Sequence, residues 1–575
     1  MQNPSSGPQN VRFGAFELDL RAGELRKEGV KVKLQDQPFQ ILAILLEQPG
    51  QVVTREALRG KLWPSDTFVD FDHSLNKAVN KLREALDDSA ESPRFIETLA
   101  KRGYRFLEQL HDRPGHIRSL LVLPLENLSR DPEQEYLADG LTEELITKLA
   151  KISALRVLSR TTAMYYKGVR KPLREIAQEL QVEGIVEGTV LRSGERVRVS
   201  AQLIHAPTDT HLWAESYEHD LRNVLTLQAE IAQAIAREVQ AKLTPQEEAQ
   251  FAEVRSVDPE GYESYLKGRY YWNARSRDGH GKAIQNFKQA ITRDPTYAPA
   301  YAGLADSLSV LGLWGLVPPR DGCGKAKELA LRAVALDCNL AEGHTSLAWS
   351  ILHYDYNFSA AEKEFERSIE LNPRYATTRQ WYGMFLATLG RFEQGLAELK
   401  HATRLDPCSS VIRWAIGFVE WRAQRHDQAI QQYEEALELD ANFAQAHWGL
   451  GIAYLENGMY ERAIAQMQKT RQISRDAPAA VVVQGEAYAA AGYRDEAHKI
   501  LEQLPAFSKQ GYVMPYFVAR IYAALGSRDE ALQWLEIGFR DHAEWMVLLK
   551  TATRFDRVRS DPRFDDLLRR MNFPP

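Results

Sequence analysis

Residues 72–86, DHSLNKAVNKLREAL, and residues 95–106, FIETLAKRGYRF, are the stretch of sequence that decides the fold of the N-terminal part of this chain. Apolar residues of the first segment recur at intervals of three and four, which predicts a helix with one buried stripe: Leu75, Val79, Leu82 and Leu86. In the second segment Gly103 can supply the positive φ of a tight turn, so we predict a β-hairpin with Lys101 and Arg102 at its tip.

The face of the predicted helix opposite the apolar stripe carries amide, imidazole, hydroxyl and basic side chains. Such side chains can reach base edges and phosphates in a major groove. The candidate DNA-binding residues on this helix are His73, Ser74, Asn76, Lys77, Asn80, Lys81 and Arg83. Together with the cationic tip at Lys101 and Arg102, they predict a clamp for double-stranded DNA. The alternative is a small α/β domain whose surface helix is simply solvated.

The chain of 575 residues is long enough for several domains rather than one. Its net charge of −6 excludes a protein that binds polyanions over its whole surface, so a DNA-binding surface has to be local. Residues 1–113 hold 17 basic and 17 acidic side chains, so this part is neutral overall. We therefore expect tight binding to need more than one copy, for example a homodimer on DNA.

Cysteine usage and hydropathy indicate the cellular compartment. The three cysteines, Cys323, Cys338 and Cys408, have neither metal-like nor paired spacing, which is typical of a reducing compartment. The N-terminus is polar and lacks the apolar core of a signal peptide. No apolar run approaches the ~20 residues that cross a bilayer. We expect a cytoplasmic protein without membrane contact, metal or cofactor.

The order of elements over residues 10–110 can be read from apolar runs and turn signals. Short strands are predicted over residues 12–20, 24–26 and 30–34. Pro38 can open a helix that is apolar nearly all round, and Thr54 can cap the next helix. The recognition-like helix and the hairpin follow.

This order of strands, three helices and a terminal hairpin resembles the OmpR/PhoB-type winged helix-turn-helix. The motifs that carry the resemblance are Lys81-Leu-Arg83, Ile96-Glu-Thr98 and Gly103-Tyr104-Arg105-Phe106. The resemblance implies that positions 73, 77, 80 and 81 face the major groove and that the hairpin, or wing, enters the minor groove. Relatives often carry arginine at position 100 and a basic residue at position 80, where this chain has alanine and asparagine.

Two groups of winged-helix relatives differ in what surrounds the DNA-binding head. Two-component relatives have a receiver domain before the head, but only about ten residues precede it here. CadC-like relatives have a membrane helix after the head, and the sequence shows none. We therefore expect the input signal to come from the residues downstream.

Residues 116–245 predict a small α/β domain. Residues 114–115, Pro-Gly, mark a linker, and an apolar strand follows at 119–125. Leucine at every fourth position over residues 137–149 predicts a helix, and residues 185–204 predict a hairpin. Polar residues 159–162 follow a strand end, where such sheets often bind ligands, although a capped helix start explains them better.

This middle domain resembles the TolB-N-terminal-like or FlgO-like domain found between bacterial regulatory heads and repeat arrays. The motifs that carry the resemblance are Leu155-Arg-Val-Leu-Ser-Arg160, Tyr166-Lys-Gly168, Glu187-Gly-Thr-Val190 and His211-Leu-Trp-Ala-Glu215. The resemblance implies no activity.

A fixed period of 34 residues runs through residues 260–575. Small residues hold one register, namely Ala361, Gly395, Ala429, Ala463, Ala497 and Ala531. A second register of glycines runs from Gly383 to Gly485, and a third of bulky residues runs from Phe365 to Leu535. Small residues allow two helices to approach closely, and bulky residues fill the space between helix pairs.

This period resembles tetratricopeptide repeats, which implies an α-solenoid of about eight helix pairs with a capping helix near residues 555–571. The units start near Ser264, Ala298, Glu342, Ala376, Ser410, Ala444, Pro478 and Tyr512. Such an array implies a groove for a protein or peptide partner, with aromatic anchors. The candidate groove residues are Trp414, Phe418, Trp421, Trp448 and Ile452; the alternative is that they only pack between repeats.

Catalytic motifs are absent from the sequence: it has no Gly-x-Ser-x-Gly, His-Glu-x-x-His or Cys-x-x-Cys. A phosphate-loop-like segment at residues 322–326 lacks the upstream glycine and the hydroxyl residue after Lys325. We expect a non-enzyme with a winged-helix head, an α/β middle domain and an α-solenoid that regulates bacterial transcription. The alternatives are a protein-interaction adaptor that does not bind DNA and a ligand-regulated enzyme subunit.

Overall fold

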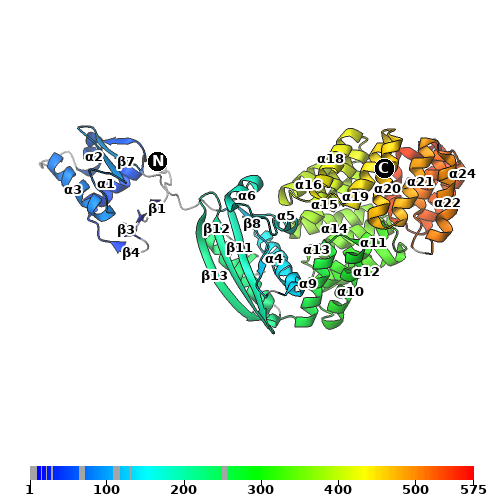
Figure 1. Ribbon diagram of the computed structural model, residues 1–575, viewed down its shortest axis with the longest axis horizontal. Helices are drawn as coiled ribbons and strands as arrows, with labels where there is room; N and C mark the ends of the chain where they lie inside the picture. Colours follow the sequence, from blue (N-terminus) through cyan, green and yellow to red (C-terminus); the bar gives the residue numbers. More distant parts are fainter. Residues whose placement is uncertain are drawn as a thin grey trace. The chain divides into compact units, whose positions relative to one another are not determined.

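The computed structural model divides the chain into two compact units, Met1–His116 and Ile117–Pro575, which are described separately. Figure 1 shows both units coloured along the sequence. The residues that the structure describes are 10–13, 16–20, 22–27, 30–63, 71–107, 117–129, 131–241, 243–245, 247–248, 256–509 and 511–574. The predicted linker at residues 114–115 lies outside this range.

In its described residues the first unit combines two antiparallel sheets with three helices. Its first sheet has the order β1 (Asn10–Phe13), β2 (Phe16–Asp19), β3 (Glu24–Lys27) and β4 (Val30–Val32). Its second sheet has the order β5 (Val52–Thr54), β7 (Gly103–Phe106) and β6 (Ile96–Leu99). The helices are α1 (Asp36–Leu46), α2 (Arg55–Leu62) and α3 (Phe71–Leu86).

One hydrophobic core holds these elements together. Leu42 and Leu45 of α1 are fully buried, as are Leu75 and Leu82 of α3. Aromatic rings from both sheets meet edge to face beside them, with Phe13 5.0 Å from Phe106. Burial of these apolar side chains supplies most of the stability of such a small unit. The predicted winged-helix head is confirmed.

The second unit begins with a mixed sheet in the order β10 (Arg156–Val157), β8 (Ser119–Val122), β11 (Gly184–Ser193), β12 (Arg196–His205) and β13 (Thr210–Asp220). Strand β8 runs parallel to β10 and β11, whereas β11, β12 and β13 are antiparallel. The accompanying helices are α4 (Glu135–Ala150), α5 (Arg160–Tyr165), α6 (Leu173–Leu180) and α7 (Val224–Glu238). This is the predicted α/β middle domain.

The rest of the second unit is an array of antiparallel helix pairs (Figure 1). In the described residues the pairs are α9 (Pro259–Asn273) and α10 (Arg277–Arg293), α11 (Ala298–Leu313) and α12 (Lys325–Leu336), α13 (Ala341–Ser350) and α14 (Phe358–Leu371), α15 (Ala376–Thr388) and α16 (Phe392–Leu405), α17 (Ser410–Arg422) and α18 (His426–Leu439), α19 (Ala444–Glu456) and α20 (Tyr460–Ser474), α21 (Pro478–Ala491) and α22 (Arg494–Phe507), and α23 (Pro515–Leu525) and α24 (Arg528–Arg540). The predicted α-solenoid is confirmed.

The 34-residue registers have a direct physical explanation in these pairs. The alanines of the small register are fully buried, for example Ala429 and Ala463. Each glycine of the second register faces a bulky side chain of the next helix: a Cβ on Gly417 would lie 2.6 Å from the Tyr433 ring. The close packing of glycine against an aromatic ring therefore fixes the distance between α17 and α18.

The middle domain and the first repeats share one hydrophobic core. Leu141 and Leu145 of α4 belong to the same buried cluster as Leu266 and Phe287 of the first helix pair. Polar contacts reinforce this packing, because Tyr136 donates to Glu263 at 2.6 Å. The middle domain is therefore fixed to the start of the array, and Figure 1 shows α4 beside α9.

The chain after α24 folds back against the inner surface of the array. The 3-10 helix η5 (Glu544–Thr551) contacts α11, α15 and the π-helical turn η4 (Ile351–Asp355). Short helices α25 (Asp556–Arg559) and α26 (Pro562–Arg570) then pack on α24, where the sequence predicted a capping helix. No helix in the described residues is long and apolar enough to cross a membrane.

Candidate nucleic-acid interface and inner surface of the repeat array

Helix α3 presents one buried and one exposed face, as the apolar period predicts. Leu75, Val79 and Leu82 are at most 1% exposed. Exposed positions recur at intervals of three and four on the other side, and they are His73, Lys77, Asn80 and Glu84. Ser74, at the edge of this stripe, is half-buried. The exposed face therefore offers an imidazole, an ammonium and an amide, with the Glu84 carboxylate at its C-terminal end.

Arg83 does not lie on this face, so the prediction that it contacts DNA is wrong. Its side chain is 6% exposed, and its Nη2 donates to the carbonyl oxygen of Ile96 at 2.7 Å and to Oγ1 of Thr98 at 2.8 Å. It lies at the edge of the exposed stripe, immediately before Glu84, where a long side chain can turn towards β6. Arg83 ties α3 to the hairpin instead.

Two further predicted contact residues also bond within the unit. The side-chain oxygen of Asn76 accepts hydrogen bonds from Oη of Tyr104 at 2.8 Å and from Nη2 of Arg55 at 3.0 Å. Nζ of Lys81 donates to Oε1 of Gln35 at 2.7 Å, and Lys81 is half-buried. Asn76 therefore positions the hairpin on α3, because Tyr104 belongs to β7.

The hairpin tip places both predicted basic residues in solvent. Lys101 and Arg102 are exposed, and the left-handed residue of the turn is Lys101, with φ of 61°. Gly103 is required for another reason than the predicted turn, since a Cβ there would overlap the carbonyl oxygen of Val53 in β5. The wing therefore carries two cations on a hairpin held at its base by a glycine.

The predicted groove residues lie inside the array rather than on an open surface. Phe418, Trp421, Trp448 and Ile452 are at most 3% exposed, and Trp414 is half-buried. The Trp448 ring centroid lies 5.1 Å from that of Trp545 in η5. The burial of Phe418, Trp421, Trp448 and Ile452 favours the alternative that these side chains pack within the array, whereas Trp414 stays partly accessible.

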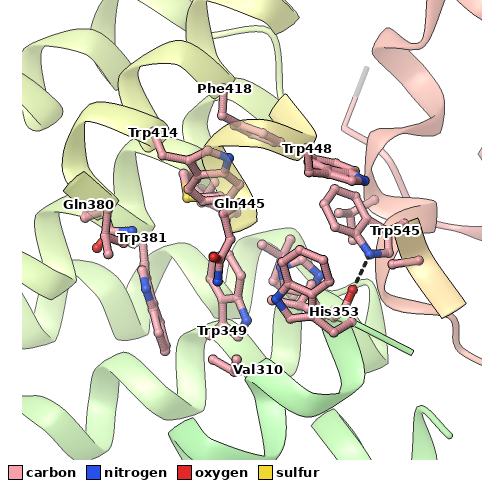
Figure 2. Close-up of a pocket in the computed structure, with 18 of the residues that line it drawn as sticks. Val310, Trp349, His353, Gln380, Trp381, Trp414, Phe418, Gln445, Trp448 and Trp545 are labelled. Atoms are coloured by element: carbon pink, nitrogen blue, oxygen red, sulfur yellow. Dashed lines mark hydrogen bonds between the residues drawn. The ribbon is translucent and has the colours of Figure 1, made fainter. Parts of the chain in front are cut away.

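Three of the five residues line a cavity of about 110 Å³. Trp414, Phe418 and Trp448 form one side, and Trp349 and Trp381 form another, as Figure 2 shows. Trp545 adds a wall from η5. Sequence periodicity could not reveal this cavity, because Trp545 lies beyond the last repeat and reaches its neighbours only through the tertiary fold.

Two histidines line the same cavity. Burial lowers the pKa of His353 to about 4, although the carbonyl of Glu544 acts in the opposite direction. Burial and the nearby Arg275 lower the pKa of His280 to about 4. Both imidazoles are therefore neutral at pH 7. Among the described residues that line the cavity, Arg275 is the one that carries a positive charge at pH 7.

The polar residues 159–162 of the middle domain cap a helix, as the simpler interpretation predicts. Oγ of Ser159 accepts from the backbone N–H of Thr162 at the start of α5. Oγ1 of Thr162 in turn donates to Oδ1 of Asp406 at 2.8 Å. These side chains therefore join the middle domain to the array.

Family comparisons match three parts of the chain. Residues 29–106 match the model described as transcriptional regulatory protein, C terminal. Residues 117–234 match the second domain of HilA/YgeH-like transcriptional regulators. Residues 422–458 match a TPR repeat model. The second match gives the middle domain a regulatory relative in addition to the TolB-like resemblance of its motifs.

Similar proteins come from several bacteria. The "Transcriptional regulator HilA" of Salmonella typhimurium is 25% identical over 411 residues, which cover 69% of this chain and 70% of that protein. The "Putative adenylate cyclase 3" of Rhizobium meliloti is 36% identical over 242 residues, covering 40% of each chain. The "Cholera toxin homolog transcriptional activator" of Vibrio parahaemolyticus is 40% identical over 76 residues, covering 13% of this chain and 26% of that protein.

This chain thus matches 40% of the length of the relative named as an adenylate cyclase and 70% of the length of HilA. The three matched models follow one another along the chain in the same order as the head, the middle domain and the array. The chain therefore has the architecture of an OmpR/PhoB-type winged-helix regulator, with a HilA-like second domain and tetratricopeptide repeats.

Proposed function

We propose that the chain regulates transcription by binding duplex DNA through its winged-helix head. Helix α3 enters the major groove with His73, Lys77 and Asn80, and the wing tip at Lys101 and Arg102 enters the adjacent minor groove. The observation that carries the proposal is the exposed polar stripe on α3, because the opposite face of the same helix is fully committed to the core.

The contacts inside the head support this geometry. Arg55 bonds Asp72 and Asn76 of α3 and stacks over the ring of Tyr104 in β7, at 5.4 Å. Arg83 makes the second connection between α3 and the hairpin. Since Arg55, Arg83 and the hydrogen bond from Tyr104 to Asn76 all join the helix to the hairpin, their spacing is set before DNA binds. A rigid reader loses less conformational entropy on binding than a flexible one.

Measuring how affinity falls with salt tests the proposal on the full chain. Lys77→Ala should reduce the slope of log K against log salt by about 0.9, the value for one lost phosphate contact. Asn80→Ala should change the preferred DNA sequence and leave the slope nearly unchanged. Lys31→Ala, an exposed lysine on β4, is the matched control and should leave both unchanged. Absence of duplex binding at low salt would favour the adaptor function instead.

We infer that the regulator binds as a homodimer. The N-terminal 113 residues carry equal numbers of basic and acidic side chains, so one head gains little from long-range attraction to DNA. Two heads on one duplex would add their contacts. Analytical ultracentrifugation with a promoter fragment should give two chains per duplex, and a single chain at saturation would contradict the inference.

We also infer that the chain acts without catalysis of its own. The sequence lacks the hydrolase and metalloprotease motifs, and most relatives named above are regulators. The relative named as a cyclase suggests the direct test, which is incubation of the purified chain with ATP and Mg²⁺. We expect no cyclic AMP, and its formation in proportion to protein concentration would overturn this inference.

A further inference from the structure

The cavity inside the array has the composition of a ligand site rather than of a packing defect. Its walls come from segments far apart in the sequence, with Trp349 on α13, Trp414 on α17 and Trp545 on η5 (Figure 2). At about 110 Å³ it has room for roughly seven to eleven water-sized groups, since one water needs ~10–15 Å³. Protein cores seldom leave so large a space between aromatic side chains.

Hydrogen-bond donors of the cavity wall have no partner among the described residues. They are the indole Nε1 atoms of Trp349, Trp414 and Trp448. Trp349 and Trp448 are only 4% and 3% exposed, so bulk water does not serve these groups. A buried donor without a partner is unfavourable, because it has given up its hydrogen bond to water and gained none in return. An occupant with hydrogen-bond acceptors would supply the partners that these three lining residues lack.

His353 supplies an acceptor at the same cavity. Its Nδ1 lies 3.0 Å from the carbonyl oxygen of Glu544, so Nδ1 carries the proton and donates. The ring is neutral, which leaves Nε2 with a lone pair, and Nε2 has no partner in the described part of the chain. His353 also lies on the π-helical turn η4, a distortion often found at functional sites. The occupant therefore needs a donor as well.

The charge of the wall is positive. The Arg275 guanidinium lies 3.7 Å from the centroid of the Trp272 ring. Burial lowers the pKa of Arg275 to about 10, and the carboxylate of Asp306, which does not line the cavity, acts in the opposite direction. None of the described residues that line the cavity is Asp or Glu. An aromatic cage for a quaternary ammonium would not place a guanidinium in its wall. The electrostatics therefore favour an anion.

We propose that this cavity binds a small aromatic carboxylic acid that also carries a hydroxyl or N–H donor. The tryptophan rings stack on its ring, Arg275 and the indole N–H groups bind its carboxylate, and His353 accepts from its donor. Every residue that lines the cavity belongs to the second unit, so binding of the acid can be measured in the absence of DNA.

The test uses the full chain and a set of probes of one size. Titration calorimetry with 4-hydroxybenzoate should give one site per chain. Benzoate lacks the hydroxyl, 4-hydroxybenzamide lacks the charge and tyramine reverses it, and each should bind about tenfold or more weakly. Failure of 4-hydroxybenzoate and of indole-3-acetate to bind at millimolar concentration, or tighter binding of tyramine, would overturn the proposal.

Variants assign the binding to this cavity. Trp414→Phe keeps an aromatic ring and removes Nε1, so it should weaken 4-hydroxybenzoate about tenfold. Arg275→Met should abolish the preference for the acid over the amide. Trp534→Phe, at an equally half-buried tryptophan outside the cavity, is the control and should bind like the parent. Melting curves confirm that each variant is folded, and unchanged affinity in folded Trp414→Phe and Arg275→Met would refute the site.

Discussion

The indole nitrogen of Trp545 donates a hydrogen bond to the carbonyl oxygen of Leu313, 2.9 Å away and 232 positions earlier in the chain. This bond joins η5 to the C-terminal end of α11 and so connects the last part of the array to its second helix pair. Nearby, Oη of Tyr356 donates to the carbonyl oxygen of Ala543 at 2.9 Å. The array is therefore closed by its own C-terminal segment.

Trp545 should contribute to stability through both packing and this bond. Trp545→Phe removes the bond and keeps most of the packing, so we expect a loss of about 1 kcal/mol in the free energy of unfolding. Trp545→Ala also removes the contacts with Trp448 and Phe517, and should cost about 3 kcal/mol. Urea unfolding followed by far-UV circular dichroism measures both losses. Equal losses in the two variants would contradict the role of packing.

Glu544 makes this closure sensitive to pH. Burial raises the pKa of its carboxyl to about 8, although the backbone N–H groups of Glu544 and Cys323 act in the opposite direction. The folded state therefore holds a proton that the unfolded state releases near pH 4.5. The proton on Glu544 therefore makes its full contribution to the free energy of unfolding below pH 4.5. That contribution falls as the pH rises to about 8, by up to about 1.4 kcal/mol per pH unit.

Glu544→Gln is the variant that isolates this effect, because glutamine has the same shape and no charge. We expect the variant to unfold at a higher temperature than the parent at pH 8 and at nearly the same temperature at pH 5. Melting curves between pH 5 and 8.5 give the difference, in which the titration of all other groups cancels. A difference that does not change with pH would contradict the raised pKa of Glu544.

The sequence predicted what depends on period and local chemistry. The spacing of Leu75, Val79 and Leu82 at intervals of four and three predicted the buried face of α3. The 34-residue registers predicted the helix pairs. Arg83 was misplaced because a helical period assigns an angle but says nothing of the length of a side chain. Arginine at the edge of the polar face is long enough to reach the backbone of β6.

The cavity could not be predicted for a different reason. A repeat period describes contacts between neighbouring repeats, whereas His353 and Trp545 meet through a return of the chain over nearly 200 positions. Aromatic character alone identified Trp414, Phe418 and Trp448 as candidate residues. Whether they bind a protein partner or line an internal cavity depends on which segment of the chain packs over them. Only the tertiary fold shows that Trp545 of η5 packs against Trp448 and lines the same cavity as Trp414 and Phe418.

A buried charge network joins α23 to α19 and α21. Nε of Arg520 donates to Glu486 at 3.0 Å and Nη2 donates to Glu456 at 3.1 Å, with Arg520 only 1% exposed. Arg520→Met leaves two carboxylates without this partner, and we expect a loss of about 3–5 kcal/mol. Arg520→Met combined with Glu486→Gln should lose less than Arg520→Met alone. A double variant that is less stable than the single one by urea unfolding would contradict this account.

In the winged-helix head, substitutions at Arg83 and Asn80 should distinguish effects on stability from effects on DNA contact. Arg83 is buried and bonds to Ile96 and Thr98, so Arg83→Met should destabilise the head by about 1–3 kcal/mol. Asn80 is exposed, so Asn80→Ala should leave stability within about 0.5 kcal/mol. Hydrogen exchange of peptides from α3 and β6 in the full chain measures both effects.

The two variants should behave in the opposite way towards DNA. Asn80→Ala removes an amide that can pair with adenine, so it should weaken the preferred duplex by about 1–3 kcal/mol while exchange stays at the parent rate. Arg83→Met should accelerate exchange in α3 and β6 and, at temperatures where the head remains folded, keep the sequence preference of the parent. If Arg83→Met changed the preferred sequence without faster exchange, Arg83 would contact bases directly, and the placement of its side chain against β6 would be wrong.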